Sequence, residues 1–198
     1  ISSRGFGARA GFGVRGVRLY TDGIPASGPD GQGQVSHFDL AGTQRVEVLR
    51  GPFSVLYGNS SGGVIAAVSA PVREARAEAG VDVGSFGLRQ VRLGAAAPIS
   101  SELDIRAAAS AMQWDGFRPQ SEAKKKTGNL RLGWQSGNDR VVLLANVLSQ
   151  PADDPLGVTR AQFDADPRQT TPQATSFDTR KELGQYQLGA SWRHRFTN

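Results

Sequence analysis

The sequence lacks several residue types on which common functional sites depend. None of its 198 residues is cysteine, so disulfides and thiolate metal sites are excluded and the redox compartment cannot be inferred. His37 and His194 are the only histidines, which excludes a metal centre built from several imidazoles. No run approaches the eighteen or so apolar residues of a transmembrane helix. The sequence therefore predicts no bound metal, no cofactor and no membrane-spanning helix.

Positive charge is in excess but is not concentrated. The net charge is +5 at pH 7, and clustered Lys and Arg would indicate nucleic-acid binding because they neutralise phosphates. The only run, however, is Lys124-Lys125-Lys126. Such a run usually marks the solvated end of a loop, and no nucleic-acid partner is expected.

Glycine is abundant, with 25 residues, and it punctuates the first part of the chain most heavily. Residues 1–72 contain turn clusters such as DGIP at 22–25 and SGPDGQGQ at 27–34. Strands are expected at 17–20, 45–49 and 64–68, and one helical turn is expected over Phe53–Tyr57, after Pro52. This part therefore predicts a small mixed domain.

Residues 73–198 show a simpler pattern, in which apolar and polar residues alternate. The predicted strands are 77–84, 90–99, 103–107, 129–135, 141–148 and 185–193, and only 141–148 blurs the alternation. A period of two indicates strands with one apolar and one polar face. The longer of these strands have about the length that a tilted strand needs to cross a bilayer.

The connections between these strands favour a transmembrane barrel over a soluble sandwich. Apart from the first, they alternate between short and long, as the turns and loops at the two ends of such barrels do. Trp134 and Trp192 fall near the short-turn side, where an aromatic girdle would lie, although both could instead be core residues of a sandwich. The expected fold is mostly β: a small mixed domain, 1–72, followed by six antiparallel barrel strands, 73–198.

Two glycine motifs match enzyme signatures but lack the context that these signatures need. GFGVRG at 11–16 fits G-x-G-x-x-G, yet VRLYTDG follows, which predicts a strand instead of the required helix. GNSSG at 58–62 fits the G-x-S-x-G nucleophile elbow, with Ser60 as nucleophile and His194 as the only downstream base. VIAAVSA after it again predicts a strand. A soluble serine hydrolase is therefore kept only as the alternative function.

The stretch VEVLRGPFSVLYGNSSGGVIAAVSA, residues 46–70, is better explained as a rigid strand–turn–strand element. With RLYTDGIP before it, the stretch strongly resembles the plug signature of TonB-dependent outer-membrane receptors. ISSRGFGARAGFGVRG, at the start of the chain, is similar to the preceding plug segment of the same family. The resemblance covers residues 1 to about 72 and implies a plug domain, with the alternating strands as the first strands of the barrel. The first and last residues read as though they lay within domains, so a fragment of a receptor is expected.

This resemblance implies a gated transporter of the bacterial outer membrane and not an enzyme. Its substrate would be a metal chelate, most often a ferric siderophore in the family, while haem, cobalamin, copper and sugar receptors share the signature. Energy would come from TonB, through an N-terminal box that this chain does not contain. Outer-membrane lipid and lipopolysaccharide would be further partners, and the three lysines could then face lipopolysaccharide.

The resemblance also implies roles for individual residues. Arg4 and Arg50 match arginines that pair with glutamates of late barrel strands, so both should look underpaired here, although both could instead be ordinary solvated arginines. The loop at 27–34 is similar to the apical loop of ferric-citrate-type receptors, which makes Asp30, Gln32 and Gln34 candidate ligand-binding residues. Asp30 could instead cap the turn through its own backbone, and the whole loop could be a solvated turn.

Membership of the barrel further predicts which side chains face lipid. The alternation places seven apolar residues on the lipid side: Val81, Val91, Leu93, Ile105, Leu130, Leu132 and Leu188.

Overall fold

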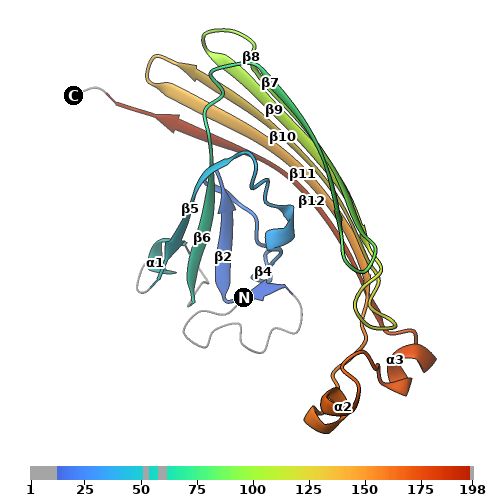
Figure 1. Ribbon diagram of the computed structural model, residues 1–198. Coiled ribbons are helices and arrows are strands. Elements are labelled where there is room, and N and C mark those ends of the chain that lie inside the picture. The colour runs from blue at the N-terminus through green and yellow to red at the C-terminus, as the bar shows by residue number, and fades with distance from the viewer. Residues whose placement is uncertain (1–12, 51–53, 58–61, 197–198) are drawn as a thin grey trace.

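The computed structural model describes residues 13–50, 54–57 and 62–196, in which two β-sheets dominate. A four-stranded sheet lies against the concave side of a larger, curved six-stranded sheet, which we call the wall (Figure 1). Arg4, Ser60 and Pro52 lie outside the described residues. Among the described residues, no helix is long and apolar enough to span a membrane.

The four-stranded sheet has the order β3-β2-β6-β5. Its strands are β2 (Val17–Thr21), β3 (Ile24–Pro25), β5 (Thr43–Leu49) and β6 (Gly63–Ser69). β2 runs parallel to β6, while the other neighbours are antiparallel. A separate pair joins β1 (Val14–Arg15) to β4 (Gln32–Gly33). The strands predicted at 17–20, 45–49 and 64–68 are confirmed.

The core of this small domain is formed by only a few apolar side chains. Leu19 is fully buried, and Val14, Val17 and Ala26 pack around it. A side chain on Gly33 would collide with Leu19, so only glycine lets β4 approach that closely. Two short helices complete the domain, η1 (Val35–His37) and α1 (Ser54–Tyr57), the second within the predicted helical turn.

The wall consists of six consecutive antiparallel strands, as predicted. They are β7 (Arg76–Gly84), β8 (Leu88–Pro98), β9 (Leu103–Trp114), β10 (Ala123–Ser136), β11 (Asp139–Asp153) and β12 (Arg180–His194). β7 and β12 are the edges of this sheet.

The two ends of the wall differ in their connections. At one end, the turn end, residues 99–102 and 137–138 close tight turns. At the other, the loop end, residues 85–87, 115–122 and 154–179 connect the strands. The predicted alternation of short and long connections is therefore present.

The longest connection, between the predicted strands 141–148 and 185–193, contains two short helices that were not predicted: α2 (Arg160–Ala165) and α3 (Pro172–Ser176). Thr159 and Gln162 form a capping box at the start of α2, and Pro172 occupies the first turn of α3. The missed signals were therefore local: a T-x-x-Q motif and a proline at a helix start.

Two further predictions about the wall were wrong. Lys124, Lys125 and Lys126 lie within β10 and not at a solvated loop end. β11 extends beyond its predicted end at residue 148 and includes Pro151, which lies opposite Glu182. Both errors arose because the loop-end parts of the strands extend beyond the bilayer-length pattern and carry polar residues that resemble loop residues.

The wall has an outer face and an inner face, which the register defines. All seven residues predicted to face lipid lie on the outer face, and five of them are at least 39% exposed: Val81, Val91, Leu93, Leu130 and Leu188. Trp134 and Trp192 both lie opposite Val141, in one outward row near the turn end. The inner face of β11 is apolar where it meets the small sheet, with Leu144 and Leu148 buried, which explains the blurred alternation at 141–148.

Candidate functional site

A buried ion cluster joins the small sheet to the inner face of the wall. It begins at the Asp22-Gly23 turn between β2 and β3, where both residues have positive φ (52° and 82°). This is the backbone that a two-residue hairpin prefers. The Asp22 carboxylate accepts hydrogen bonds from the backbone N–H (2.8 Å) and the hydroxyl of Ser69.

The same carboxylate faces the wall. Its Oδ2 lies 3.6 Å from Nε of Arg131, and both side chains are only 4% exposed. Arg131 also pairs with Asp104 of the neighbouring strand β9. The cluster therefore places one cation between an anion of the small domain and an anion of the wall.

Arg106, one strand along from Arg131 in the same row, is a second buried cation at this interface. A side chain on Gly42 would collide with Arg106 and with the Asp39 carboxylate, so the small domain approaches the wall closely here. Nε and Nη1 of Arg106 have no hydrogen-bond partner among the described residues. Arg106 also lines a cavity of about 20 Å³, which is large enough for a water molecule.

The predicted ligand loop lies at the end of the small sheet that points towards the loop end, where Figure 1 shows β4. The loop is held in place: Leu19 N–H donates to Ser27 Oγ (3.0 Å), and Arg18 donates to the Gly28 carbonyl (3.2 Å). A hollow of about 420 Å³ lies between this loop and residues 183–188 of β12.

Gln32 and Gln34 line this hollow, whereas Asp30 does not. Oδ1 of Asp30 accepts a hydrogen bond from the Gln32 N–H (3.1 Å), which is the turn-capping contact foreseen as its alternative role. Gln187 of β12 donates to the Pro25 carbonyl (2.8 Å) and so connects the wall to the loop.

A second cavity, of about 450 Å³, lies on the other flank of the small domain. It is bounded by residues 36–41 and by the inner faces of β7–β10, with Ser110, Thr127 and Asn129 among its polar groups. Arg92 in this cavity pairs with Asp82 (2.9 Å), while Lys125 has no ion pair with any described residue. The inner face therefore offers hydroxyl, amide and ammonium donors.

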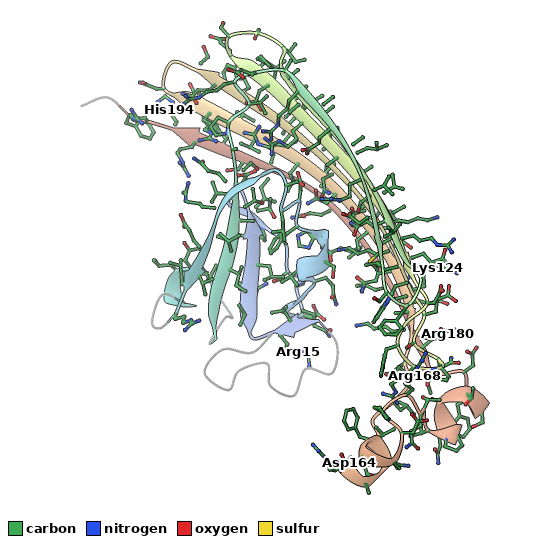
Figure 2. The ribbon with its side chains drawn as sticks, in the orientation of Figure 1. Arg15, Lys124, Asp164, Arg168, Arg180 and His194 are labelled. Atoms are coloured by element: carbon green, nitrogen blue, oxygen red, sulfur yellow. The ribbon has the colours of Figure 1, made fainter. Side chains whose placement is uncertain are left out.

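The loops at the loop end are tied to one another. Phe86 and Phe117 pack edge to face at 5.1 Å, and the Arg168 guanidinium lies 5.9 Å and 5.6 Å from their rings (Figure 2). Arg118 donates to the carbonyl groups of Gln169 (2.8 Å) and Pro155 (3.0 Å). Three separate loops at the loop end are thus joined to one another.

The remaining residues singled out in the sequence are not part of these sites. Arg50 is exposed and makes no ion pair with a described residue. His194 contacts Asp139 (2.9 Å) on the outer face at the turn end. The strand β6 follows Ser60, where a nucleophile elbow needs a helix, so the structure gives the hydrolase alternative no support. Within the described ranges, no group of three or more His, Asp or Glu residues could hold a metal ion.

The Asp22–Arg131–Asp104 cluster was not predicted from the sequence. Its signals were present, since the TDG turn and two inward arginines can be read from the sequence. Their contact depends on how the small domain docks in the wall, which no local pattern reports.

His37 allows a prediction on pH dependence. Its ring is 1% exposed, and Nδ1 donates to the Gln34 carbonyl. Burial lowers the pKa of His37 below its ordinary value near 6.5; the hydrogen bond to Gln34 opposes this change and the charge of Lys125 adds to it. Because the unfolded segment binds the proton more readily than the folded one, the protection of its amides against hydrogen exchange should fall as the pH drops below about 6.5. We expect hydrogen exchange of residues 35–38, corrected for intrinsic rates, to show this loss.

The matched control for this prediction is His37→Gln, which removes the titrating group. Its opening free energy should be independent of pH over the same range. An equal pH dependence in the wild type and in His37→Gln would contradict the prediction.

Comparison with known proteins supports the same architecture. Residues 1–64 match the family model of the TonB-dependent Receptor Plug Domain. Among solved structures, the chain is similar to the ferric citrate transporter FecA in its unliganded form, with a TM-score of 0.63, 23% identity and coverage of 80% of this chain and 27% of that one. It is also similar to the ferripyoverdine receptor of the outer membrane of Pseudomonas aeruginosa (TM-score 0.62, 17% identity, 90% and 25% covered).

A third similar structure is the siderophore receptor PirA from Pseudomonas aeruginosa, with a TM-score of 0.55, 24% identity and coverage of 72% and 27%. The chain thus spans about a quarter of the length of these proteins. The shared fold is that of a plug domain followed by strands of an outer-membrane barrel. Residues 1–64 thus match the plug domain of TonB-dependent receptors, and the chain has the fold of such a plug with barrel strands, as the sequence resemblance implied.

Proposed function

We propose that this chain forms part of a TonB-dependent outer-membrane receptor that takes up a metal chelate, with a ferric siderophore as the substrate class. The observation that carries the proposal is the plug-family match over residues 1–64, on a domain docked in the concave face of barrel strands. Within this proposal residues 1–72 are the plug and 73–198 the first barrel strands. TonB would supply the energy, and outer-membrane lipid would surround the outer face.

The two open edges of the wall support a larger barrel. Unpaired backbone groups at β7 and β12 would be prohibitively costly in lipid. Further strands would therefore pair with both edges in the complete receptor. Fractionation of cells that express the complete gene tests this placement: the receptor should sediment with the outer membrane, and its recovery in the soluble fraction would contradict the proposal.

The proposed substrate class rests on the plug family and on the donors at the two cavities. FecA is described as a ferric citrate transporter and PirA as a siderophore receptor. Oxygen-rich chelates of this kind accept hydrogen bonds from amides, hydroxyl groups and ammonium groups. The hollow beside Gln32 and Gln34 and the cavity beside Lys125 present such donors.

Gln32 and Gln34 give the ligand proposal a direct test. Replacing both by alanine in the complete receptor is expected to weaken chelate binding by about 1–3 kcal/mol, because each amide would lose a hydrogen bond made in a desolvated site. Binding should be measured by titration of the purified receptor with the chelate that it transports. Asp30→Asn, which changes a side chain outside the hollow, is the matched control. Unchanged affinity in the double variant, at normal surface expression, would contradict the role of the loop.

Arg4 and Arg50 remain proposed partners of barrel glutamates. The exposure of Arg50, with no ion pair to any described residue, is compatible with a partner on a later strand. A structure of the complete receptor in which Arg50 meets no carboxylate would contradict this pairing.

A further inference from the structure

The small domain is fastened to the wall by polar contacts on one flank, formed by β10–β12. Two such links join the described residues of the two parts: the ion pair of Asp22 with Arg131, and the hydrogen bond from Gln187 to the Pro25 carbonyl (2.8 Å). The inner face of β11 between them is packed against the small domain, with four side chains at most 5% exposed: Val142, Leu144, Asn146 and Leu148. The β10–β12 flank is therefore sealed.

The flank formed by β7–β9 is different. Residues 36–42 of the small domain border it and are drawn in light blue in Figure 1, between the small sheet and the wall. Within the part of the chain that the structure describes, no hydrogen bond or ion pair joins this segment to the wall. Asp39 is instead bonded inside the small domain, where its carboxylate accepts from the Gly42 N–H (3.2 Å) and its carbonyl accepts from the Thr43 hydroxyl (2.7 Å). The segment can therefore part from β7–β9 without breaking a hydrogen bond.

A series of cavities follows this second flank from the loop end towards the turn end. The cavity of about 450 Å³ shares Asp39, Glu78 and Ala108 with a smaller one of about 10 Å³. The smaller one shares Asp39, Gly42 and Arg106 with the cavity of about 20 Å³ beside the ion cluster. The space between the small domain and the wall is thus wide near the loop end and narrows to a constriction at Arg106.

The constriction is closed by a single row of the wall. Among the inward residues of β8 and β9, only Ala96 and Arg106 are buried, and they are neighbours in this row. The segment approaches them so closely that a side chain on Gly42 would collide with Arg106. Closure leaves Nε and Nη1 of Arg106 without a partner among the described residues, and unsatisfied buried donors are costly. The closed contact is therefore weak at its narrowest point.

Basic side chains accompany the cavities along this flank. Lys125 lies near the loop end, and Arg106 and Arg76 share one row nearer the turn end. None of the three forms an ion pair with a described residue. Residues 125–131 of β10 separate the two positions by about 20 Å at the rise of a strand. By contrast, the hollow beside β12 has no charged residue in its lining.

We propose that the chelate passes the plug on this second flank, between residues 36–42 and β7–β9, while the β10–β12 flank stays fastened. Movement of residues 36–42 away from the wall would open the constriction. The unpartnered donors of Arg106 would then bind oxygen atoms of the chelate as it passes. The inference rests on the proposed function, to which it adds a route and the residue at the narrowest point of that route.

The test fastens each flank in turn, which is possible because the chain has no cysteine of its own. Ile24→Cys with Gly189→Cys fastens the β12 side, since a Cβ at Gly189 would lie 3.6 Å from that of Ile24, a separation that suits a disulfide. Ala41→Cys with Ala108→Cys fastens the second flank, because both residues line the large cavity and a bifunctional methanethiosulfonate can bridge them. A reductant cleaves both linkages.

Uptake of the radiolabelled chelate should be measured in iron-starved cells that express the complete receptor. It should continue at the wild-type rate with positions 24 and 189 joined. It should stop with positions 41 and 108 joined and return on reduction, while chelate binding at the cell surface stays unchanged. The single-cysteine variants, treated with the same reagent, are the controls.

Two substitutions test the route without a linkage. Ala108→Trp fills the junction of the cavities and should lower the uptake rate with unchanged chelate affinity, whereas Ala107→Trp, on the outer face of the same strand, should alter neither. Arg106→Met breaks no hydrogen bond between described residues. It should still lower the maximal uptake rate about tenfold, as expected for one lost hydrogen bond to a charged group, and leave chelate affinity unchanged.

Other outcomes would overturn the proposal. Uptake that stops only when positions 24 and 189 are joined would place the route on the β10–β12 flank. Loss of uptake with either linkage would mean that the plug must move as a whole. Continued uptake with both linkages would place the route inside the plug. A wild-type receptor that takes up no chelate would instead refute the proposed function.

Discussion

Replacing Asp22 by asparagine is expected to destabilise the plug by about 3 kcal/mol, because Arg131 would lose one of two anionic partners while it stays buried. Asparagine keeps the shape of the side chain and tolerates the positive φ of this position, so the change isolates the charge. The contact with Asp104 remains, which places the effect at the lower end of the range for broken buried pairs. Hydrogen exchange of β2 and β6 amides in the complete receptor measures the loss.

A second variant distinguishes the effect of breaking the ion pair from other effects of a substitution at Asp22. Asp22→Asn combined with Arg131→Met and Asp104→Asn removes all three charges of the cluster and should recover part of the stability, since neutral replacement of a buried ion cluster is often tolerated. Asp30→Asn, at an exposed carboxylate, should change stability by less than about 0.5 kcal/mol. If Asp22→Asn behaves like Asp30→Asn, the cluster does not hold the plug to the wall.

Placing arginine at Leu130 is expected to cost about 2–4 kcal/mol of barrel stability. Leu130 lies in a mid-wall outward row between Ala107 and Ala145, where the side chain would meet hydrocarbon. The same substitution at Ser136, an outward position at the end of β10, should cost about 0–1 kcal/mol because the charge reaches the interface. Reversible urea unfolding of the receptor in phospholipid vesicles compares the two variants.

The pair Leu130→Arg and Ser136→Arg tests the outer face as a lipid-facing surface. A depth-dependent cost is the signature of a bilayer, since a soluble sandwich has no such gradient. Equal costs at the two positions would contradict the assignment of this face to lipid.

The wall could be predicted from the sequence because each of its strands separates two environments at a period of two. Leu130 and Leu132 alternate with inward residues, and the seven predicted residues all reached the outer face. The alternation failed where it met a different environment. Val142 and Leu144 point inward but pack against the plug, so β11 is apolar on both faces.

The site was harder to predict from the sequence because it forms only where the small domain docks against the wall. Gln34 could be placed on a loop from the turn residues before it, and the resemblance gave that loop a role. Gln32, predicted on the same loop, lies instead in the short strand β4. That Asp22 would meet Arg131 could not be inferred, because the contact joins two sheets and depends on where the plug sits in the wall. Inward arginines look alike in sequence whether they face water or a buried carboxylate.

Energy-coupled uptake by the complete protein, as we propose it, moves a metal chelate with energy from TonB. Uptake of radiolabelled iron should be compared in iron-starved cells with the gene intact, with the gene deleted and with TonB inactivated. The chelates should include carboxylate, hydroxamate and catecholate types, together with haem. Uptake of at least one chelate should be lost on deletion and equally lost without TonB. The proposal would be contradicted if the uptake of every chelate persisted after deletion of the gene, or if gene-dependent uptake persisted without TonB.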